Sequence, residues 1–413
     1  MSMISKKTTS NTKYALIGIL VLTFLFFVSF FPGIGLLYYN RQYFYFLVIL
    51  YAIVTYDGKI SGKLFSGEKP LILFSLLVTV VSMVNHIRMT DVIAPLYFIV
   101  SCIFAKMIVG KNPGDTDKNL SMLVKLVEKM YVCIAFLYLG ITLLGKRNSA
   151  WVYAAYIFPA MLPFIFWGQK EERKKWYVFV LGFIAVLLTM KRGPLLCMFA
   201  VPVVYLISII LSKKYSLNKR FKFFFVLALG TFAVVLLGIT MIQSDQMNTF
   251  IRLLDIKNEL EHSRGPLFKA TIEAFMDSDT IFKLFGHGFN SVVADELIPT
   301  TGSLLSSHND FIEILYNAGI VGILLYVIFL VNVFIAAIKL CRANDKWGFM
   351  MLAALCTFLT QSNVSHLYLY NYIFHFWIVL WVCGILKAKK LKSVATYNYG
   401  CLNRQYSIVN YRY

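Results

Sequence analysis

The chain has 413 residues, of which 59% are hydrophobic and only 15% charged, and its mean hydropathy is +0.70. Soluble domains average about 25% charged residues, so this composition excludes an ordinary soluble fold and, with its repeated long apolar runs, indicates a polytopic membrane protein. The formal net charge of +20 does not point to nucleic acid, because the Lys and Arg residues cluster in short segments between apolar runs, as in membrane-protein loops.

Twelve apolar runs approach the length of roughly 20 residues that a helix needs to cross a bilayer. Lysines precede the first run and no small-residue cleavage pattern follows it, so we expect an uncleaved first span rather than a signal peptide. No repeat or linker divides the chain, which predicts one all-α transmembrane domain over residues 1–413. The predicted spans are 15–37, 42–55, 70–85, 92–109, 121–144, 150–168, 176–190, 193–211, 221–243, 311–340, 347–361 and 368–386.

The distribution of basic residues predicts which side of the membrane each loop lies on. When the N-terminus is placed in the cytoplasm and the spans alternate, the inner loops collect most of the lysines and arginines, and the outer loops hold few. This bias follows the positive-inside rule, and it predicts that both termini are cytoplasmic. The inner set includes Lys59, Lys63, Lys111, Lys118, Lys170, Arg173, Lys174, Lys175, Lys213, Lys214, Lys219, Arg220, Arg342, Lys346, Lys387 and Lys389.

One long polar segment, residues 244–310, breaks the pattern of short loops and falls on the outer side. It holds ten of the twenty acidic residues of the chain, and long loops of this kind are often functional. We predict helices within it, since 264–276 has a partly amphipathic pattern. Residues 282–290 indicate a turn, in which Gly286 and Gly288 allow unusual backbone angles.

The turn between the seventh and eighth spans carries Lys191 and Arg192, followed by Gly193. Its shortness predicts a tight hairpin or a single broken helix. Lys191 can be a simple anchor that extends to the headgroups. Arg192 lies on the side that the positive-inside rule depletes, and its guanidinium can bind phosphate through two hydrogen bonds.

The outer loop contributes Arg264, His287 and the run Ser306-Ser307-His308-Asn309-Asp310. Arginine and histidine often occur in such loops only because the loop is solvated. His308 differs, because it lies where the chain re-enters the membrane and its imidazole exchanges protons near neutral pH. The predicted topology places Arg192, Arg264 and His308 on one face, which suits a site for an anionic diphosphate leaving group. We predict these three as catalytic, and Lys191, His287 and Asn309 as substrate-binding.

Two alternatives for metal chemistry are open at this level. Asp277-Ser278-Asp279 has a DxD spacing that suits a metal holding a diphosphate, although we interpret it instead as a polar turn between helices. The seven cysteines are odd in number, form no CxxC motif and mostly lie in apolar runs. They therefore predict neither a disulfide framework nor a metal site, and we expect no metal and no cofactor.

Three motifs around the outer loop resemble a known family. Phe285-Gly286-His287-Gly288-Phe289, then His308-Asn309-Asp310-Phe311-Ile312-Glu313-Ile314-Leu315, then Ala318-Gly319-Ile320-Val321-Gly322 resemble the signature region of the O-antigen ligase and polymerase superfamily. Arg192 and Arg264 also fall where that family has its functional arginines. Some members place Leu five residues after the His, where this chain has Glu313.

The resemblance implies a membrane-embedded glycosyltransferase of GT-C-like fold in the bacterial inner membrane, whose donor is a glycan on undecaprenyl diphosphate. Arg192 and Arg264 would hold the diphosphate, and His308 would act as base for the acceptor hydroxyl or contact the diphosphate. The family also raises a chain-length regulator as a partner protein. We expect a polymerase of lipid-linked repeat units. The alternatives are a ligase that moves the glycan to lipid A-core or another acceptor, and a transporter of the same lipids.

Overall fold

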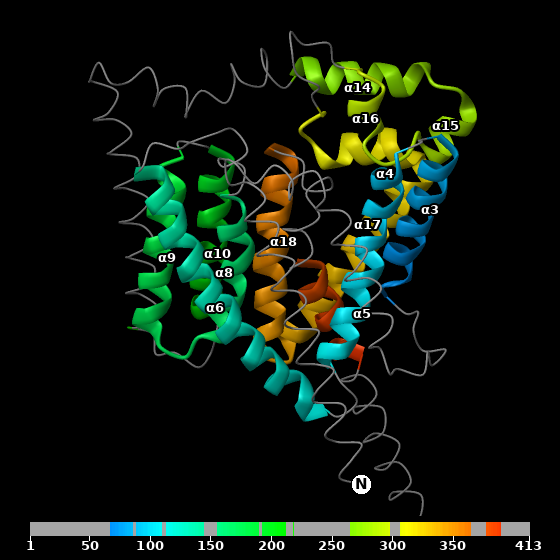
Figure 1. The fold of residues 1–413 in the computed structure, drawn as a ribbon. Coiled ribbons are helices and arrows are strands. Elements are labelled where there is room, and N and C mark those ends of the chain that lie inside the picture. The colour runs from blue at the N-terminus through cyan, green and yellow to red at the C-terminus, as the bar shows by residue number, and fades with distance from the viewer. Residues whose placement is uncertain are drawn as a thin grey trace, which may run out of the picture.

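The computed structural model describes residues 67–85, 88–109, 113–143, 155–189, 192–211, 218, 265–297, 306–364 and 377–389. Within these ranges the chain is helical and contains no strand, which confirms the all-α prediction for this part (Figure 1). The helices are α3 (Lys69–Asn85), α4 (Met89–Ile93), η2 (Ala94–Leu96), α5 (Tyr97–Val109), α6 (Pro113–Leu143), α8 (Ile157–Gly168), α9 (Glu172–Leu187), α10 (Arg192–Leu211), α14 (Gly265–Asp277), α15 (Thr280–Phe285), α16 (Ser291–Ala294), α17 (Asp310–Arg342), α18 (Lys346–Val364) and a helical segment at 377–389.

Most of these helices stand side by side as a bundle, and α14, α15 and α16 gather at one end of it (Figure 1). α14 lies across that end, at a large angle to the bundle helices. We call it the loop end, and the opposite end, where Lys106, Lys174 and Lys387 lie, the basic end. α18 packs against both α10 and α17, so it joins the two helices that begin at the loop end.

Apolar side chains on the outside of the bundle indicate contact with lipid. α17 exposes Ile320, Leu324, Ile328, Val331 and Ile335 at spacings of three and four residues, which places them on one face of the helix. α3 exposes a similar row, formed by Leu73, Leu76, Val80, Met83 and Val84. Surfaces of this kind are rare on soluble monomers and typical of a membrane boundary. The described part therefore has the exterior expected of a membrane protein.

Nine of the twelve predicted spans fall on helices of the described ranges, and the spans at 15–37, 42–55 and 221–243 lie outside them. Two of these helices, Met89–Val109 and Asp310–Arg342, are long and apolar enough to cross a membrane by themselves. Lys69–Asn85, Ile157–Gly168 and Gly193–Ile209 are apolar but shorter. The count of twelve spans and the direction of the termini stay predictions.

α9 and α10 form a hairpin, which decides between the two predictions for the turn at Lys191. The rings of Phe183 in α9 and Phe199 in α10 meet edge to face with their centroids 5.3 Å apart. Farther from the turn, Lys175 in α9 contacts Tyr205 in α10. The contacts pair an early residue of one helix with a late residue of the other, so the two helices run antiparallel and the single broken helix is excluded.

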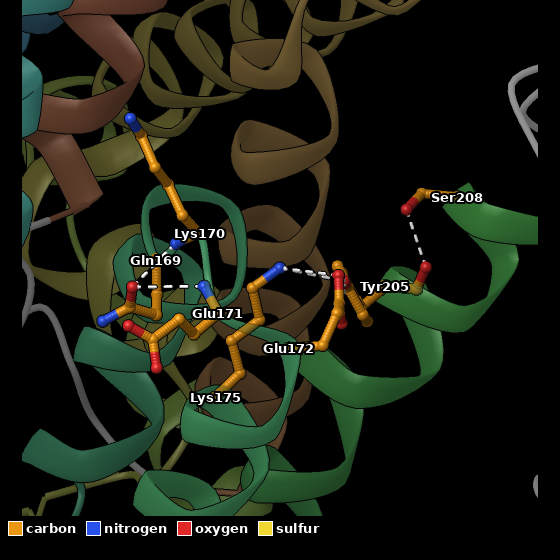
Figure 2. A network of polar contacts seen from close by, with 7 residues as sticks. All are labelled: Gln169, Lys170, Glu171, Glu172, Lys175, Tyr205 and Ser208. Carbon is orange, nitrogen blue, oxygen red and sulfur yellow. Dashed lines mark hydrogen bonds and ion pairs between the residues drawn. The ribbon is translucent and has the colours of Figure 1, made fainter.

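A polar network closes this hairpin at the basic end (Figure 2). The Tyr205 hydroxyl donates to the Glu172 carboxylate, at 2.6 Å from Oε1, and accepts from Lys175 Nζ at 2.9 Å. Lys175 Nζ also lies 3.2 Å from Glu172 Oε1. Nearby, Lys174 Nζ lies 2.6 Å from Glu128 Oε1, and this hydrogen-bonded ion pair raises the pKa of the Lys174 ammonium. The network ties α9 to α10 and to α6.

Ion pairs also join the other helices at the basic end. Lys106 of α5 lies 3.1 Å from Glu68, which is fully buried just before α3. Lys387 lies 2.7 Å from Asp345, in the turn between α17 and α18. Partly buried, hydrogen-bonded pairs hold helix ends together but need their partners, because a lone buried charge is costly. The cations of these pairs therefore serve to hold helix ends together, and we look for the candidate site at the loop end.

Candidate functional site

The candidate site is built around the turn at which the chain enters α17 from the outer loop. Asn309 is the N-cap of α17, and its Oδ1 accepts hydrogen bonds from the backbone N–H groups of Phe311 (3.0 Å) and Ile312 (3.2 Å). These bonds satisfy two donors that a helix start otherwise leaves without partners. His308, one residue earlier, has a φ of 55°. A positive φ is unfavourable for a residue with a Cβ, so the surrounding contacts hold the histidine in this conformation.

Two acidic side chains lie buried directly after this turn. Asp310 and Glu313 are both fully buried in the first turns of α17. The Ser362 hydroxyl of α18 donates to Asp310 Oδ2 at 2.7 Å. Glu313 Oε2 accepts from the Ser307 backbone N–H at 2.8 Å and from the Ser307 hydroxyl at 2.6 Å. Buried carboxylates persist only with such partners, so this end of α17 carries a buried, hydrogen-bonded polar cluster inside an otherwise apolar bundle.

The depth in the bundle at which α10 begins can be compared with that of His308 through α18. The Asp310–Ser362 bond places Ser362 of α18 level with the His308 turn. α10 and α18 pack together, and Cys197 Sγ lies 3.8 Å from the Thr357 carbonyl oxygen. Because the helices are antiparallel, Arg192 and Ser362 each lie five residues closer to the loop end, or about 7.5 Å at 1.5 Å per residue. The backbone of Arg192 is therefore at the depth of Ser362 and of the His308 turn, on the other side of α18.

At the same depth in the bundle, Gly193 allows the Tyr156 ring to pack closely against the start of α10. A Cβ at position 193 would meet the hydroxyl of Tyr156, which is buried against the first turn of α10. The Arg192-Gly193-Pro194 sequence thus begins a helix whose first turn is packed tightly against a neighbouring aromatic ring. The N-terminus of α10 carries the positive end of the helix dipole at the loop end of the bundle.

The Gly286-His287-Gly288 and Ala318-Gly319-Ile320 motifs pack against each other, and we call this contact the glycine joint. α17 is broken at Gly319, which has φ 65° and ψ −170°. The backbone N–H groups of His287 and Gly288 donate to the carbonyls of Tyr316 (3.1 Å) and Asn317 (2.8 Å), just before the break. Gly286 has a φ of 83°, and a Cβ there would overlap the Asn317 carbonyl, as a Cβ at Gly319 would overlap that of Leu284. Only glycine fits at these two contacts.

His287 lies inside this joint, between two aromatic rings. Its imidazole stacks on Phe282 with centroids 4.5 Å apart and on Tyr316 at 4.3 Å. The Ser278 hydroxyl lies 2.9 Å from His287 Nε2. Both faces of the ring are thus covered, and the contacts hold α15 against α17. A substrate contact by His287 stays a prediction.

A second, smaller core attaches the rest of the outer segment to α17. Leu267 and Phe275 of α14 are buried against Val292 and Tyr316. The predicted helix at 264–276 is therefore confirmed as α14, with Leu267, Thr271 and Phe275 on its buried face. Ile272 and Met276, which belong to the same apolar pattern, are exposed. The described part of the loop, residues 265–297, is thus folded and rests on the first part of α17.

The structure describes the predicted site residues unequally. His308 and Asn309 lie together in the turn before α17, and Arg192 is the first residue of α10, where only its backbone is described. Lys191 and Arg264 lie outside the described residues, although α14 begins directly after Arg264, at Gly265. Convergence of the two arginine side chains on His308 therefore stays a prediction.

Metal chemistry receives no support from the residues in view. Within the described ranges, no group of three or more His, Cys, Asp or Glu residues is placed to hold a metal ion. Of the DxD sequence, Ser278 donates to the Ala274 carbonyl at 2.7 Å and Asp279 is the N-cap of α15. These positions are those of a turn between helices, which was the second interpretation of the spacing.

Sequence reasoning missed the buried polar side chains beneath His308, namely Ser307, Asp310, Glu313, Asn317 and Ser362. A signal for them was present. Acidic and amide side chains inside an apolar helix are costly in a membrane and usually mark a site, and Glu313 and Asn317 lie four residues apart on one face of α17.

Residues 177–327 match the family model described as O-antigen ligase. The match begins in α9, includes the His308 turn and the glycine joint, and ends in α17, so the resemblance predicted from the motifs is confirmed. Proteins of this family are membrane-embedded, glycosyltransferase-like enzymes, and the match supports ligase- or polymerase-type activity on lipid-linked glycans without separating the two. The search of curated proteins gave no match.

Proposed function

We propose, from this family match, that the protein polymerises undecaprenyl-diphosphate-linked oligosaccharide repeat units on the outer face of the bacterial inner membrane. The observation that carries the proposal is the His308 turn. An imidazole stands at the loop end of the bundle, level with the start of α10, in a backbone conformation that its neighbours impose. The GT-C-like fold, the single domain with a large extracytoplasmic loop at 244–310 and the cytoplasmic termini belong to the same proposal.

The proposed reaction exchanges one glycosyl bond for another. The bond between the anomeric carbon of the donor glycan and its phosphate oxygen breaks, and a bond from an acceptor sugar hydroxyl to that carbon forms. The hydroxyl proton passes to the His308 imidazole, and undecaprenyl diphosphate leaves with the bonding electron pair. A general base typically contributes about 10²–10⁴-fold to the rate, which is a task suited to a histidine near neutral pH.

Arg192 and Arg264 are proposed to bind the departing diphosphate. Both positions adjoin the start of a helix, α10 and α14, where backbone N–H groups and the helix dipole also favour anions. Fixed donors of this kind act on charge that develops in the transition state, and each can supply about 3–4 kcal/mol. Lys191 and Asn309 are proposed as substrate contacts beside them. A metal is not required, since the guanidinium groups would neutralise the diphosphate.

The test is a reconstitution of the purified protein in detergent with lipid-linked repeat units. Under the proposal, longer glycans form without any membrane gradient, and Arg192→Ala, Arg264→Ala and His308→Ala each abolish elongation while the protein stays folded. Lys269→Ala serves as a matched control, because Lys269 is an exposed cation of α14 that pairs with Glu273, one turn away on the same helix. Normal elongation by any two of the three variants would disprove the assignment of the site.

A ligase is the second candidate, because the family match supports ligase and polymerase activity alike. Donor and mechanism would be the same, so the acceptor decides. If the protein transfers the glycan to lipid A-core or another acceptor and never to a second repeat unit, it is a ligase. Export of the lipid-linked unit with no new glycosyl bond would instead identify a transporter. A chain-length regulator would change the length distribution of the product and leave the bond formed unchanged.

A further inference from the structure

We propose that Glu313 is a positioning residue for His308, which holds the histidine through Ser307. The inference rests on the proposed function only in that it takes His308 as the reacting group. Glu313 touches neither substrate nor reacting atoms in this proposal. Its carboxylate fixes the backbone of the residue before His308 and thereby determines where the imidazole stands.

The contacts form a closed loop around the histidine. Glu313 lies one turn inside α17, and its Oε2 accepts both the N–H (2.8 Å) and the hydroxyl (2.6 Å) of Ser307. The Ser307 oxygen also lies 3.0 Å from the Asn309 carbonyl and 3.4 Å from the Asn309 nitrogen. Glu313 N–H in turn donates to the Asn309 carbonyl at 2.9 Å. His308 is thus enclosed between two neighbours that are each anchored to the same turn of helix.

We call the contacts among Ser307, Asn309 and Glu313 the clamp. They explain how the backbone of His308 is kept at a positive φ. A positive φ at a residue with a Cβ costs roughly 1–3 kcal/mol and persists only where surrounding contacts over-determine it. Asn309 fixes the backbone after His308 by capping α17. Ser307, which is fully buried, fixes the backbone before it. With the Glu313 carboxylate removed, Ser307 loses its bonds to the second turn of α17 and keeps only its contacts with Asn309, so we expect His308 to relax toward a negative φ.

The choice of a carboxylate at position 313 needs a reason, because helix packing alone does not require it. A buried carboxylate carries a desolvation penalty, whereas a leucine of similar size would fill the same space without one. The carboxylate also interacts with the buried Asn317 amide, one turn further along α17, but that contact joins two residues of the same helix and does not involve the His308 turn. What the glutamate supplies and a leucine cannot is the pair of hydrogen bonds to Ser307. The geometry therefore favours a role in shaping the turn.

The experiment compares Glu313→Leu, Glu313→Gln and Ser307→Ala in the full-length protein. Glu313→Leu removes both bonds to Ser307, while Glu313→Gln keeps an acceptor oxygen at the same reach. We expect Glu313→Leu to lower kcat by roughly 10- to 100-fold, the effect of misplacing a reacting group by about 1 Å, with KM changed less than about threefold. Glu313→Gln should restore kcat to within about threefold of wild type. Ser307→Ala, which loses the hydroxyl bond only, should fall between them.

A second readout does not depend on activity. Diethyl pyrocarbonate modifies exposed imidazoles, and mass spectrometry measures the rate for each histidine separately. The rate at His308, which is half-buried, should change several-fold in Glu313→Leu and stay as in wild type in Glu313→Gln. His287, stacked between two rings in the glycine joint, provides an internal reference whose rate should stay constant in all variants.

Asn332→Ala is the matched control for loss of a polar contact in the same helix. Asn332 lies toward the basic end of α17, and its Nδ2 donates to the Gly67 carbonyl at 3.3 Å, remote from the turn. It should keep normal kcat and a normal His308 modification rate. If Glu313→Leu does not fold, Ser307→Ala and Glu313→Gln carry the test by themselves.

The outcomes separate this inference from the proposed function. Glu313→Leu or Ser307→Ala with normal kcat and normal modification of His308 would overturn the clamp. So would a Glu313→Gln variant as impaired as Glu313→Leu, since charge and not the hydrogen bonds would then matter. If wild-type protein forms no glycosyl bond, the proposed function fails, while the modification rates still decide whether Glu313 holds His308.

Discussion

Replacing Gly319 by alanine tests the joint that holds the outer segment on α17. Gly319 has φ 65° and ψ −170°, a region that is essentially restricted to glycine. A Cβ at this position would also overlap the backbone of Leu284, at the end of α15. Backbone atoms cannot rotate away as a side chain can, so α15 must separate from the break in α17.

The cost follows from two terms. Placing alanine in this backbone region costs of order 1–3 kcal/mol. Separating α15 from α17 removes the hydrogen bonds from His287 N–H and Gly288 N–H to α17 carbonyls, each of which contributes about 1 kcal/mol. Together these predict that Gly319→Ala lowers the free energy of unfolding by about 3–5 kcal/mol. The outer segment, and with it the loop end of the site, should become sensitive to proteolysis.

Unfolding by denaturant titration in detergent micelles, followed by tryptophan fluorescence, measures the loss. Gly140→Ala is the control, because Gly140 lies within α6 and a Cβ there would meet nothing within 4 Å. Alanine is favoured over glycine inside a helix by roughly 0.5–1 kcal/mol, so this variant should be as stable as wild type or slightly more so. A Gly319→Ala protein within about 1 kcal/mol of wild type, with an intact outer segment, would refute the account of the joint.

Three further substitutions test single contacts with the same titration. Tyr205→Phe removes the hydroxyl at the centre of the basic-end network and should cost about 1 kcal/mol, while glycan elongation stays normal; an unchanged stability would show that the network is dispensable. Ser362→Ala takes one hydrogen bond from the buried carboxylate of Asp310 and should cost about 1–3 kcal/mol, a loss that Ser362→Thr should largely restore. His287→Phe keeps the ring stack and loses the bond to Ser278, so it should cost about 1 kcal/mol with an unchanged KM for the donor lipid; a several-fold rise in KM would instead support the predicted substrate contact.

The helices were predictable because the apolar runs that form them are long. A run such as 311–340 can bury one face and expose the other to lipid only as a helix, and α17 covers it with its start and end within about two residues. The amphipathic pattern at 264–276 likewise predicted α14. Short connections were also informative, since the turn after α9 left a hairpin as one of only two arrangements.

The sequence could not predict which residues pair across the bundle. The bond between Asp310 and Ser362 joins residues 52 positions apart, and the joint between Gly286 and Gly319 depends on two backbones meeting at one point. Composition and periodicity carry no information on such pairings. The break in α17 was hidden for the same reason: a lone glycine in an apolar run is compatible with an unbroken helix until another segment is found packed against it.

The distribution of buried polar groups explains why chemistry is expected at one end of the bundle. At the basic end, Lys106 pairs with Glu68 and Lys387 with Asp345, so these partly buried cations hold helices together. At the loop end the fully buried polar groups around His308 are carboxylates, hydroxyls and the Asn317 amide, with Asp310 and Glu313 in the first turns of α17. Such groups cannot neutralise a diphosphate, so a site for one at this end needs cations supplied from elsewhere. Arg192, at the first residue of α10, and Arg264, directly before α14, are the two arginines that the proposed function assigns to that role.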